Sequence, residues 1–159
     1  MRAKQVGTVG AGLLACWVGV GLMDSPNPIA TAAPSELRLG AVDLDAVLHV
    51  IRQVETGGHP DPANAIGDQG RSLGPYQISR AYFQDAIDHD PSLYGLEYEC
   101  VRDQRMSEII MLAYFERWVP AWTMESLCRT HNGGPKGRFM DSTIPYWNRC
   151  IREIRAAET

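Results

Sequence analysis

The chain has 159 residues, of which 45% are hydrophobic and 21% charged, and its formal net charge is −4. This length supports one domain with a substantial core but hardly two. The acidic balance excludes a general attraction to nucleic acid or anionic lipid, so we expect no nucleic-acid partner and substrate capture in a shaped cleft.

Residues 1–32 have the features of a secretory signal peptide, because Arg2 and Lys4 precede an apolar run that ends near small residues at 30–32. A membrane anchor is the alternative, since the run is about as long as a short spanning helix. Its glycines and the small-residue site favour cleavage. Cys16 also fits a lipoprotein cleavage box, and its lipidation is the one route we expect to a stable membrane partner. The protein is therefore predicted to be secreted, periplasmic or attached to the cell envelope.

Residues 33–42 are predicted to be a linker, because this part of the chain is rich in Pro, Ala and Ser and lacks apolar periodicity. The folded domain is then 43–159. Loss of the signal peptide leaves 13 basic and 18 acidic residues, a net charge of −5.

The first predicted helix begins after the N-cap Asp43 and stops at the glycine pair 57–58. One face carries residues at spacings of four, three and four, namely Leu44, Leu48, Ile51 and Glu55. A carboxylate thus lies in line with the core stripe. The next segment, 59–78, is dense in Gly, Pro, Asn and Asp, which predicts a small hairpin or an irregular loop pair.

Four further elements are expected. Ser79 caps a helix through Ala86, a longer helix runs from Val101 to Trp118 before Pro120, and Thr123 caps a short helix to Arg129. A glycine-rich loop, 131–137, precedes a final helix that starts at Ser142 or Thr143. The expected core residues of the helix before Pro120 are Ile109, Ile110, Ala113 and Trp118, and the final helix carries Ile144, Trp147, Ile151 and Ile154. The predicted fold class is α+β, predominantly α, with a small β-hairpin after the first helix.

Three cysteines remain after removal of the signal peptide, namely Cys100, Cys128 and Cys150. At most one internal disulfide can form among them. Their spacing does not resemble a zinc site, so we predict no metal, and nothing in the sequence indicates another cofactor.

Glu55 and Asp68 form a candidate catalytic pair. Burial and the negative end of a helix dipole both disfavour an ionised Glu55, so we expect its carboxyl to keep its proton. Asp68 lies in the polar turn GDQG, where hydrogen bonds and solvent favour the charged form. Two carboxyl groups in unlike surroundings are what glycoside cleavage needs.

Four segments, VETGG, GDQGRSLGPYQISRAYFQDA, CRTHNGGPKG and IPYWNRC, resemble successive motifs of the invertebrate-type (destabilase) lysozymes. The resemblance implies a lysozyme-like α+β fold and hydrolysis of the β-1,4 bond between N-acetylmuramic acid and N-acetylglucosamine, so that the partner is peptidoglycan or a chitin-like glycan. It also implies that Glu55 and Asp68 are the catalytic carboxylates. Animal members carry a dense disulfide framework, including a cysteine where Leu73 stands here, so stability must come from the core instead.

Six further residues are predicted to bind the substrate. His131 and Asn132 offer directional hydrogen bonds, while Gly133 and Gly134 let the backbone approach a sugar. A bracing role in the loop is the alternative for His131. Gln77 is a candidate for N-acetyl recognition, by resemblance to a cleft wall of lysozyme-like enzymes. Tyr82 is expected to stack on a sugar ring, with a place in the core as the alternative.

Two other functions stay open. ETGG followed by SLGPYQI also resembles the lytic transglycosylases, which need one catalytic glutamate, here Glu55. A lysozyme-like fold that binds glycan without cleaving it is the other. The destabilase group is further credited with isopeptidase action, which would recruit Ser72 and His131, but no spacing argument supports that pair.

Overall fold

The computed structural model describes residues 42–157 and 159, which form five α-helices and a small antiparallel sheet. The predicted signal peptide, 1–32, lies outside the described residues, as does the predicted linker, 33–42, apart from Val42. The helices are α1 (Leu44–Thr56), α2 (Arg80–His89), α3 (Gln104–Trp118), α4 (Met124–Gly133) and α5 (Ile144–Ala157). The strands are β1 (Ile66–Gly67), β2 (Ser72–Leu73) and β3 (Ile78–Ser79).

Short 3₁₀ helices occupy most of the connections between these elements. They are η1 (Pro62–Asn64), η2 (Asp68–Gly70), η3 (Pro91–Leu93), η4 (Tyr98–Arg102), η5 (Gly134–Phe139) and η6 (Asp141–Thr143). Within the described part of the chain, no helix has the length and apolar character needed to cross a membrane.

Helix α1 has the predicted boundaries. The Asp43 carboxylate accepts a hydrogen bond from the Ala46 amide at 3.1 Å, which satisfies one of the free amides of the first turn. At the other end the Gly57 amide donates to the Gln53 carbonyl at 2.8 Å. The buried face of α1 consists of Val47, Leu48, Val50, Ile51 and Thr56. Both the helix and its caps were therefore readable from local sequence.

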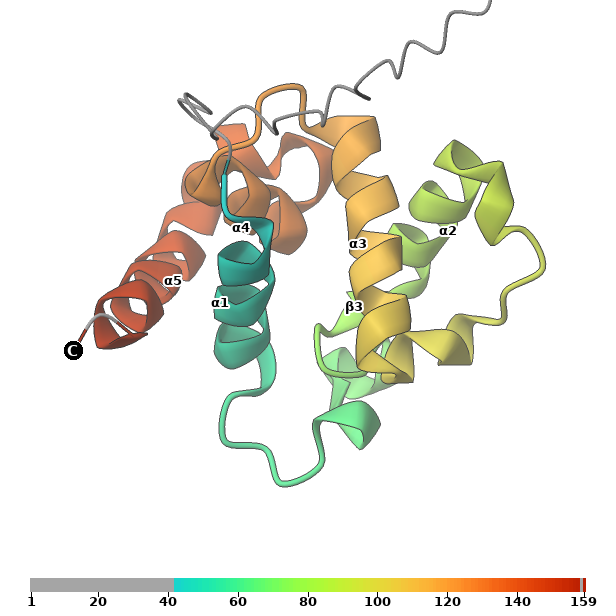
Figure 1. The fold of residues 1–159 in the computed structure, drawn as a ribbon, viewed down its shortest axis with the longest axis horizontal. Helices are drawn as coiled ribbons and strands as arrows, with labels where there is room; N and C mark the ends of the chain where they lie inside the picture. Colours follow the sequence, from blue (N-terminus) through green and yellow to red (C-terminus); the bar gives the residue numbers. More distant parts are fainter. Residues whose placement is uncertain (1–41, 158) are drawn as a thin grey trace, which may run out of the picture. The chain divides into compact units, whose positions relative to one another are not determined.

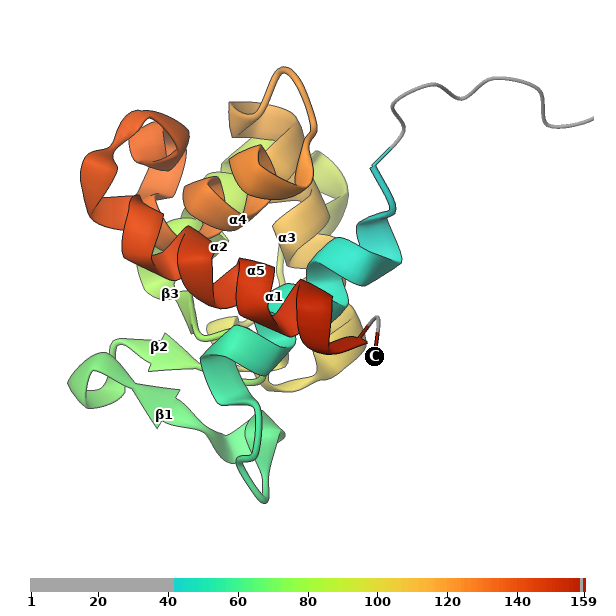
Figure 2. The same cartoon turned by 90° about the vertical axis from the view of Figure 1, so that its left-hand side faces the viewer.

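The sheet has the strand order β1-β2-β3, and each neighbouring pair is antiparallel. Ile66 pairs with Leu73, and Leu73 pairs in turn with Ile78. Figure 2 shows the strands beside the C-terminal end of α1. The Thr56 hydroxyl donates to the Pro75 carbonyl at 2.9 Å, so the end of α1 is attached to the segment between β2 and β3. The predicted α+β class with a small sheet after the first helix is confirmed.

The other helices pack on one another and on α1, and α2 also contacts β3. Helix α2 lies along α3, and α5 contacts both α1 and α4 (Figure 1). Large side chains from different elements fill the space between them and are almost fully buried. They include Ile51 of α1, Ile78 of β3, Ile110, Met111 and Phe115 of α3, and Leu127 of α4.

Several predicted boundaries and core positions were wrong. The third long helix begins at Gln104, because residues 98–102 form η4 and the Asp103 carboxylate caps the following helix. Ile110 and Ala113 are buried as expected, whereas Ile109 is 39% exposed. Adjacent residues on a helix point about 100° apart, so Ile109 and Ile110 cannot both face the core.

Helices α2 and α4 are both longer than predicted. The Ser79 hydroxyl accepts from the Tyr82 amide at 3.3 Å, as expected of a cap, but α2 continues to His89. Helix α4 continues to Gly133, so His131 and Asn132 belong to its last turn and the predicted loop begins later.

The buried residues of helix α5 are not among the four apolar residues noted on it in the sequence. Its buried residues are Tyr146 and Cys150, while Trp147 and Ile154 are half-buried and Ile144 is 41% exposed. The partners α1 and α4, which the sequence does not specify, select this face.

The three cysteines are free thiols. Cys128 of α4 and Cys150 of α5 are fully buried and their thiols meet, whereas Cys100 is half-buried. The hydrogen bond from Cys150 and burial raise the pKa of Cys128 well above its usual range. Burial, followed by the charges of Asp103 and Glu99, raises the pKa of Cys100.

We expect an alkylating reagent at mildly alkaline pH to label Cys100 slowly in the folded protein, and Cys128 only after unfolding, because the thiolate is the reactive form and Cys128 is enclosed. Mass spectrometry of peptides after timed labelling measures both rates. Equal labelling of the two residues in the folded protein would contradict the packing of α4 on α5.

Gly74, in the connection between β2 and β3, has a φ of +76°, and a Cβ there would overlap with the Val101 carbonyl. We expect Gly74→Ala to destabilise the fold by roughly 2–4 kcal/mol, from backbone strain plus displacement of η4. The matched control is Gly95→Ala, with a φ of +87° and open space around it, which should cost about 1 kcal/mol. Denaturant unfolding measures the free energy of unfolding of the two variants. Equal decreases would show that the structure relieves the overlap at position 74 without a cost in free energy.

Candidate active site

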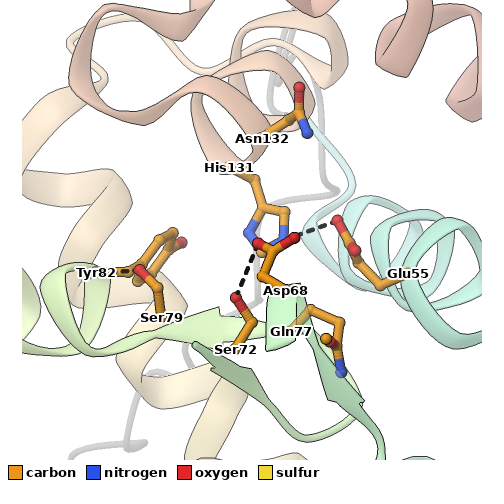
Figure 3. Close-up of a pocket in the computed structure, with 9 residues that line it drawn as sticks. Glu55, Asp68, Ser72, Gln77, Ser79, Tyr82, His131 and Asn132 are labelled. Atoms are coloured by element: carbon orange, nitrogen blue, oxygen red, sulfur yellow. Dashed lines mark hydrogen bonds and ion pairs between the residues drawn. The ribbon is translucent and has the colours of Figure 1, made fainter. Parts of the chain in front are cut away.

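A pocket of about 360 Å³ lies between the end of α1, the sheet and the end of α4. It is lined by Glu55, Gly67, Asp68, Ser72, Gln77, Ser79, Tyr82, His131 and Asn132. In Figure 3, Glu55 enters from α1, His131 and Asn132 from α4, and Asp68 from the turn beside the sheet. Six of the eight residues predicted from the sequence therefore lie around one cavity.

Glu55 occupies the shielded side of this pocket. Its side chain is 19% exposed, and Oε1 lies 3.5 Å from Nε2 of His131. The next residue, Thr56, is the one attached to the Pro75 carbonyl, so the backbone that carries Glu55 is fixed to the sheet. A carboxyl group is thereby held at the boundary between the core and the cavity.

Asp68 occupies the open side. It is exposed and has a φ of 48°, and it is followed by Gln69 at 61° and Gly70 at 91°. A run of left-handed residues is costly for side chains larger than glycine, and such strain concentrates at functional sites. The Ser72 hydroxyl donates to Asp68 Oδ2 at 3.5 Å, and the Arg71 guanidinium donates to its carbonyl at 3.0 Å. The turn thus directs this carboxylate into the pocket (Figure 3).

Gln77 is the third non-glycine residue with a positive φ, at 49°. Its side-chain amide donates to the Gly74 carbonyl at 2.8 Å. The amide oxygen lies against Gly67, where a Cβ would overlap with it. A second hollow, lined partly by Thr56 and His59, shares Glu55, Gly67 and Gln77 with the first. Gln77 therefore stands where the two hollows meet.

His131 and Asn132 lie on the last turn of α4. The His131 side chain is 3% exposed, with Nε2 toward Glu55 and a buried Nδ1 that has no hydrogen bond within the described chain. Gly133 and Gly134 do not line the pocket. Gly133 packs against Thr143, where a Cβ would overlap with its methyl group, and Gly134 turns the chain with a φ of 76°.

Tyr82 lines the pocket but is only 7% exposed. Its ring stacks on Tyr114 with centroids 3.5 Å apart, and its edge meets His131 at 5.5 Å. One face of the ring is therefore already occupied. Burial raises the pKa of Tyr82 well above its usual range, so the phenol is neutral.

Ser72 lines the pocket and Tyr146 lies behind it, and the sequence did not predict substrate binding for either residue. Ser72 is buried and bonds Asp68, so its hydroxyl does not pair with His131 as a Ser–His nucleophile would. Tyr146 is 2% exposed and lies behind Glu55, because α5 packs on α1. The motif IPYWNRC contained the signal for Tyr146, but helical phase alone did not show which of its aromatic residues faces inward.

Among residues 42–157 and 159, no three His, Cys, Asp or Glu side chains are grouped as metal ligands would be. The chemistry of the pocket is that of two carboxyl groups, one shielded and one in solvent. Such a pair suits proton donation to a leaving group by one member and stabilisation of positive charge by the other.

Comparison with known proteins finds similar curated sequences. The chain is 31% identical to a lysozyme of Magallana gigas over 113 residues, which cover 68% of this chain and 78% of the relative. It is 29% identical to a lysozyme of Ostrea edulis over 109 residues, or 65% and 76% of the two chains. No family model matches the sequence.

A solved structure with a similar fold also matches this chain. Inhibitor-bound lysozyme from Meretrix lusoria superposes with a TM-score of 0.58 at 28% identity, over 71% of this chain and 91% of that one. Both the predicted lysozyme-like fold and the predicted family are thereby confirmed. With the paired carboxyl groups, these relatives show that the chain belongs to the invertebrate-type lysozyme family, as a glycosidase of the lysozyme type.

Proposed function

We propose that the protein is a lysozyme that hydrolyses the β-1,4 bond between N-acetylmuramic acid and N-acetylglucosamine, with Glu55 as general acid and Asp68 as second carboxylate. The observation that carries the proposal is the shared pocket, in which Glu55 is 19% exposed beside His131 while Asp68 lies in solvent. One carboxyl group is shielded and the other is open to solvent, and glycoside cleavage uses two carboxyl groups in unlike surroundings.

In the proposed reaction, Glu55 donates its proton to the glycosidic oxygen as the bond to the anomeric carbon breaks. Asp68 faces the other side of the sugar and stabilises the positive charge that develops there, either as an ion or by bonding to the anomeric carbon. Water then gives its hydroxyl to that carbon and returns a proton to Glu55. The starting protonation of Glu55 stays a prediction of the sequence analysis.

The remaining pocket residues are proposed to bind and orient the glycan. Gln77 and Asn132 present amide groups suited to N-acetyl substituents. His131 contacts Glu55 and the cavity, so it serves both to hold the acid and to meet the sugar. Tyr82 contributes the uncovered part of its ring. Gly133 and Gly134 support the end of α4 from behind the pocket.

The protein is also proposed to act outside the cytoplasm. The support is the basic and apolar sequence of residues 1–32, together with a glycan substrate that lies in the cell envelope. Parallel assays on purified peptidoglycan and on chitin would separate the two substrate classes.

We expect Glu55→Gln to reduce the rate of peptidoglycan cleavage by about 10²- to 10⁴-fold, because an amide cannot donate the proton. Asp68→Asn should reduce it by roughly 10²-fold through loss of electrostatic stabilisation. Turbidity and released reducing ends measure both losses. The matched control is Glu116→Gln, an exposed carboxylate outside the pocket, which should keep full activity. Undiminished cleavage by Glu55→Gln would overturn the proposal, and no cleavage by the wild type would favour a glycan-binding protein.

The products distinguish hydrolysis from lytic transglycosylation. We expect muropeptides with ordinary reducing ends that incorporate oxygen from labelled water, because water supplies the hydroxyl group at the anomeric carbon in the proposed reaction. A transglycosylase releases 1,6-anhydro ends, which are lighter by one water molecule, and mass spectrometry separates the two. Anhydro products together with an active Asp68→Asn variant would contradict the hydrolase and support the alternative.

A further inference from the structure

Tyr146 has a buried hydroxyl group without a well-formed hydrogen bond to another described residue. The residue lies on α5 and is 2% exposed, and within the described chain its hydroxyl makes no hydrogen bond of normal geometry. Buried tyrosine hydroxyls usually have a partner, because the desolvated group costs free energy without one. The position of this hydroxyl therefore needs an explanation other than packing.

The strongest acceptor that faces the hydroxyl is the carboxyl group of Glu55 on α1. The other groups near it are the thiols of Cys128 and Cys150, which form only weak hydrogen bonds. The Arg149 guanidinium lies over the ring, 5.1 Å from its centroid. Burial, then the charge of Glu55, raises the pKa of Tyr146 well above its usual range, so the phenol stays a neutral donor.

Glu55 is thus bordered on its interior side by two rings. His131 of α4 lies 3.5 Å from Oε1, and the His131 and Tyr146 rings lie 6.4 Å apart. The pocket side of the carboxyl group faces Asp68, in the turn after β1, and the edge of Tyr82, on α2. A general acid needs one oxygen free for the substrate, so a donor on the interior side would fix the other oxygen.

We propose that Tyr146 is a positioning residue whose hydroxyl donates a hydrogen bond to Glu55 once that residue has given up its proton. This inference rests on the proposed role of Glu55 as general acid. The bond stabilises the carboxylate that forms in the transition state and fixes the rotation of the carboxyl group about its last torsion. No bond to Tyr146 is made or broken, and the phenol keeps its proton.

The test is the pH dependence of kcat for Tyr146→Phe, which removes only the hydroxyl group. Without the donor the carboxylate is less stable, so Glu55 holds its proton to higher pH and is a weaker acid. We expect the basic limb of the profile to move up by about one pH unit and kcat to fall about tenfold, with KM unchanged. The fold should be retained, because the lost hydroxyl is unpartnered.

A second substitution should shift the basic limb of the pH profile in the opposite direction. Replacement of Tyr146 by 3-fluorotyrosine keeps the ring and makes the hydroxyl a stronger donor, so the basic limb should move to lower pH. The matched control is Tyr98→Phe, whose buried hydroxyl lies outside the pocket and donates to the Ile78 carbonyl at 2.6 Å and the Arg71 carbonyl at 3.3 Å. That variant should lose stability and keep the wild-type pH profile.

The outcomes separate the two proposals. An inactive Glu55→Gln with opposite shifts in the two Tyr146 variants supports both. If Glu55→Gln is inactive but both Tyr146 variants keep the wild-type pH profile of kcat, the role of Tyr146 is overturned and Glu55 remains the acid. An active Glu55→Gln overturns the proposed function, and the inference about Tyr146 with it.

Discussion

The contact between Glu55 and His131 joins the end of α1 to the end of α4, and the pocket depends on it. Each end is fixed by a separate interaction: Thr56 bonds the Pro75 carbonyl, and Gly133 packs directly on Thr143. Both helices are also packed on α5, so the backbone positions from which the two side chains extend are fixed by the core. A rigid framework therefore holds a polar pair at its surface, which is what preorganised chemistry requires.

The opposite wall of the pocket is built by a different physical device. Asp68 and Gln77 both hold left-handed backbone conformations that are unfavourable for residues with side chains. A short sheet with close turns imposes them, and Gly67 allows the Gln77 amide to approach. One carboxyl group is thus set by helix packing and the other by local backbone strain, which leaves the first shielded and the second in solvent.

The sequence predicted the parts of this site that depend on local spacing. Asp43, the apolar stripe and the glycines at 57–58 located Glu55 on a helix end, because capping and periodicity act within a few residues. The sequence failed where a residue had two local interpretations. The glycines after Asn132 suggested a loop from His131 onward. Helix α4 instead includes His131 and Asn132 and ends at Gly133, because its packing on α5 and η5 outweighs the weak helix propensity of glycine.

The sequence by itself determined the family to which the chain belongs and the side chains that are candidates for its chemistry. Only the tertiary structure decided which of them meet, because the distance between α1, α4 and the sheet is set by packing among residues far apart in the chain. It brought Asp68 to the same cavity as Glu55, left Gly133 and Gly134 behind it, and selected Tyr146 as the inward ring of α5. Helical phase limits which faces a helix offers, but its neighbours select the face that is buried.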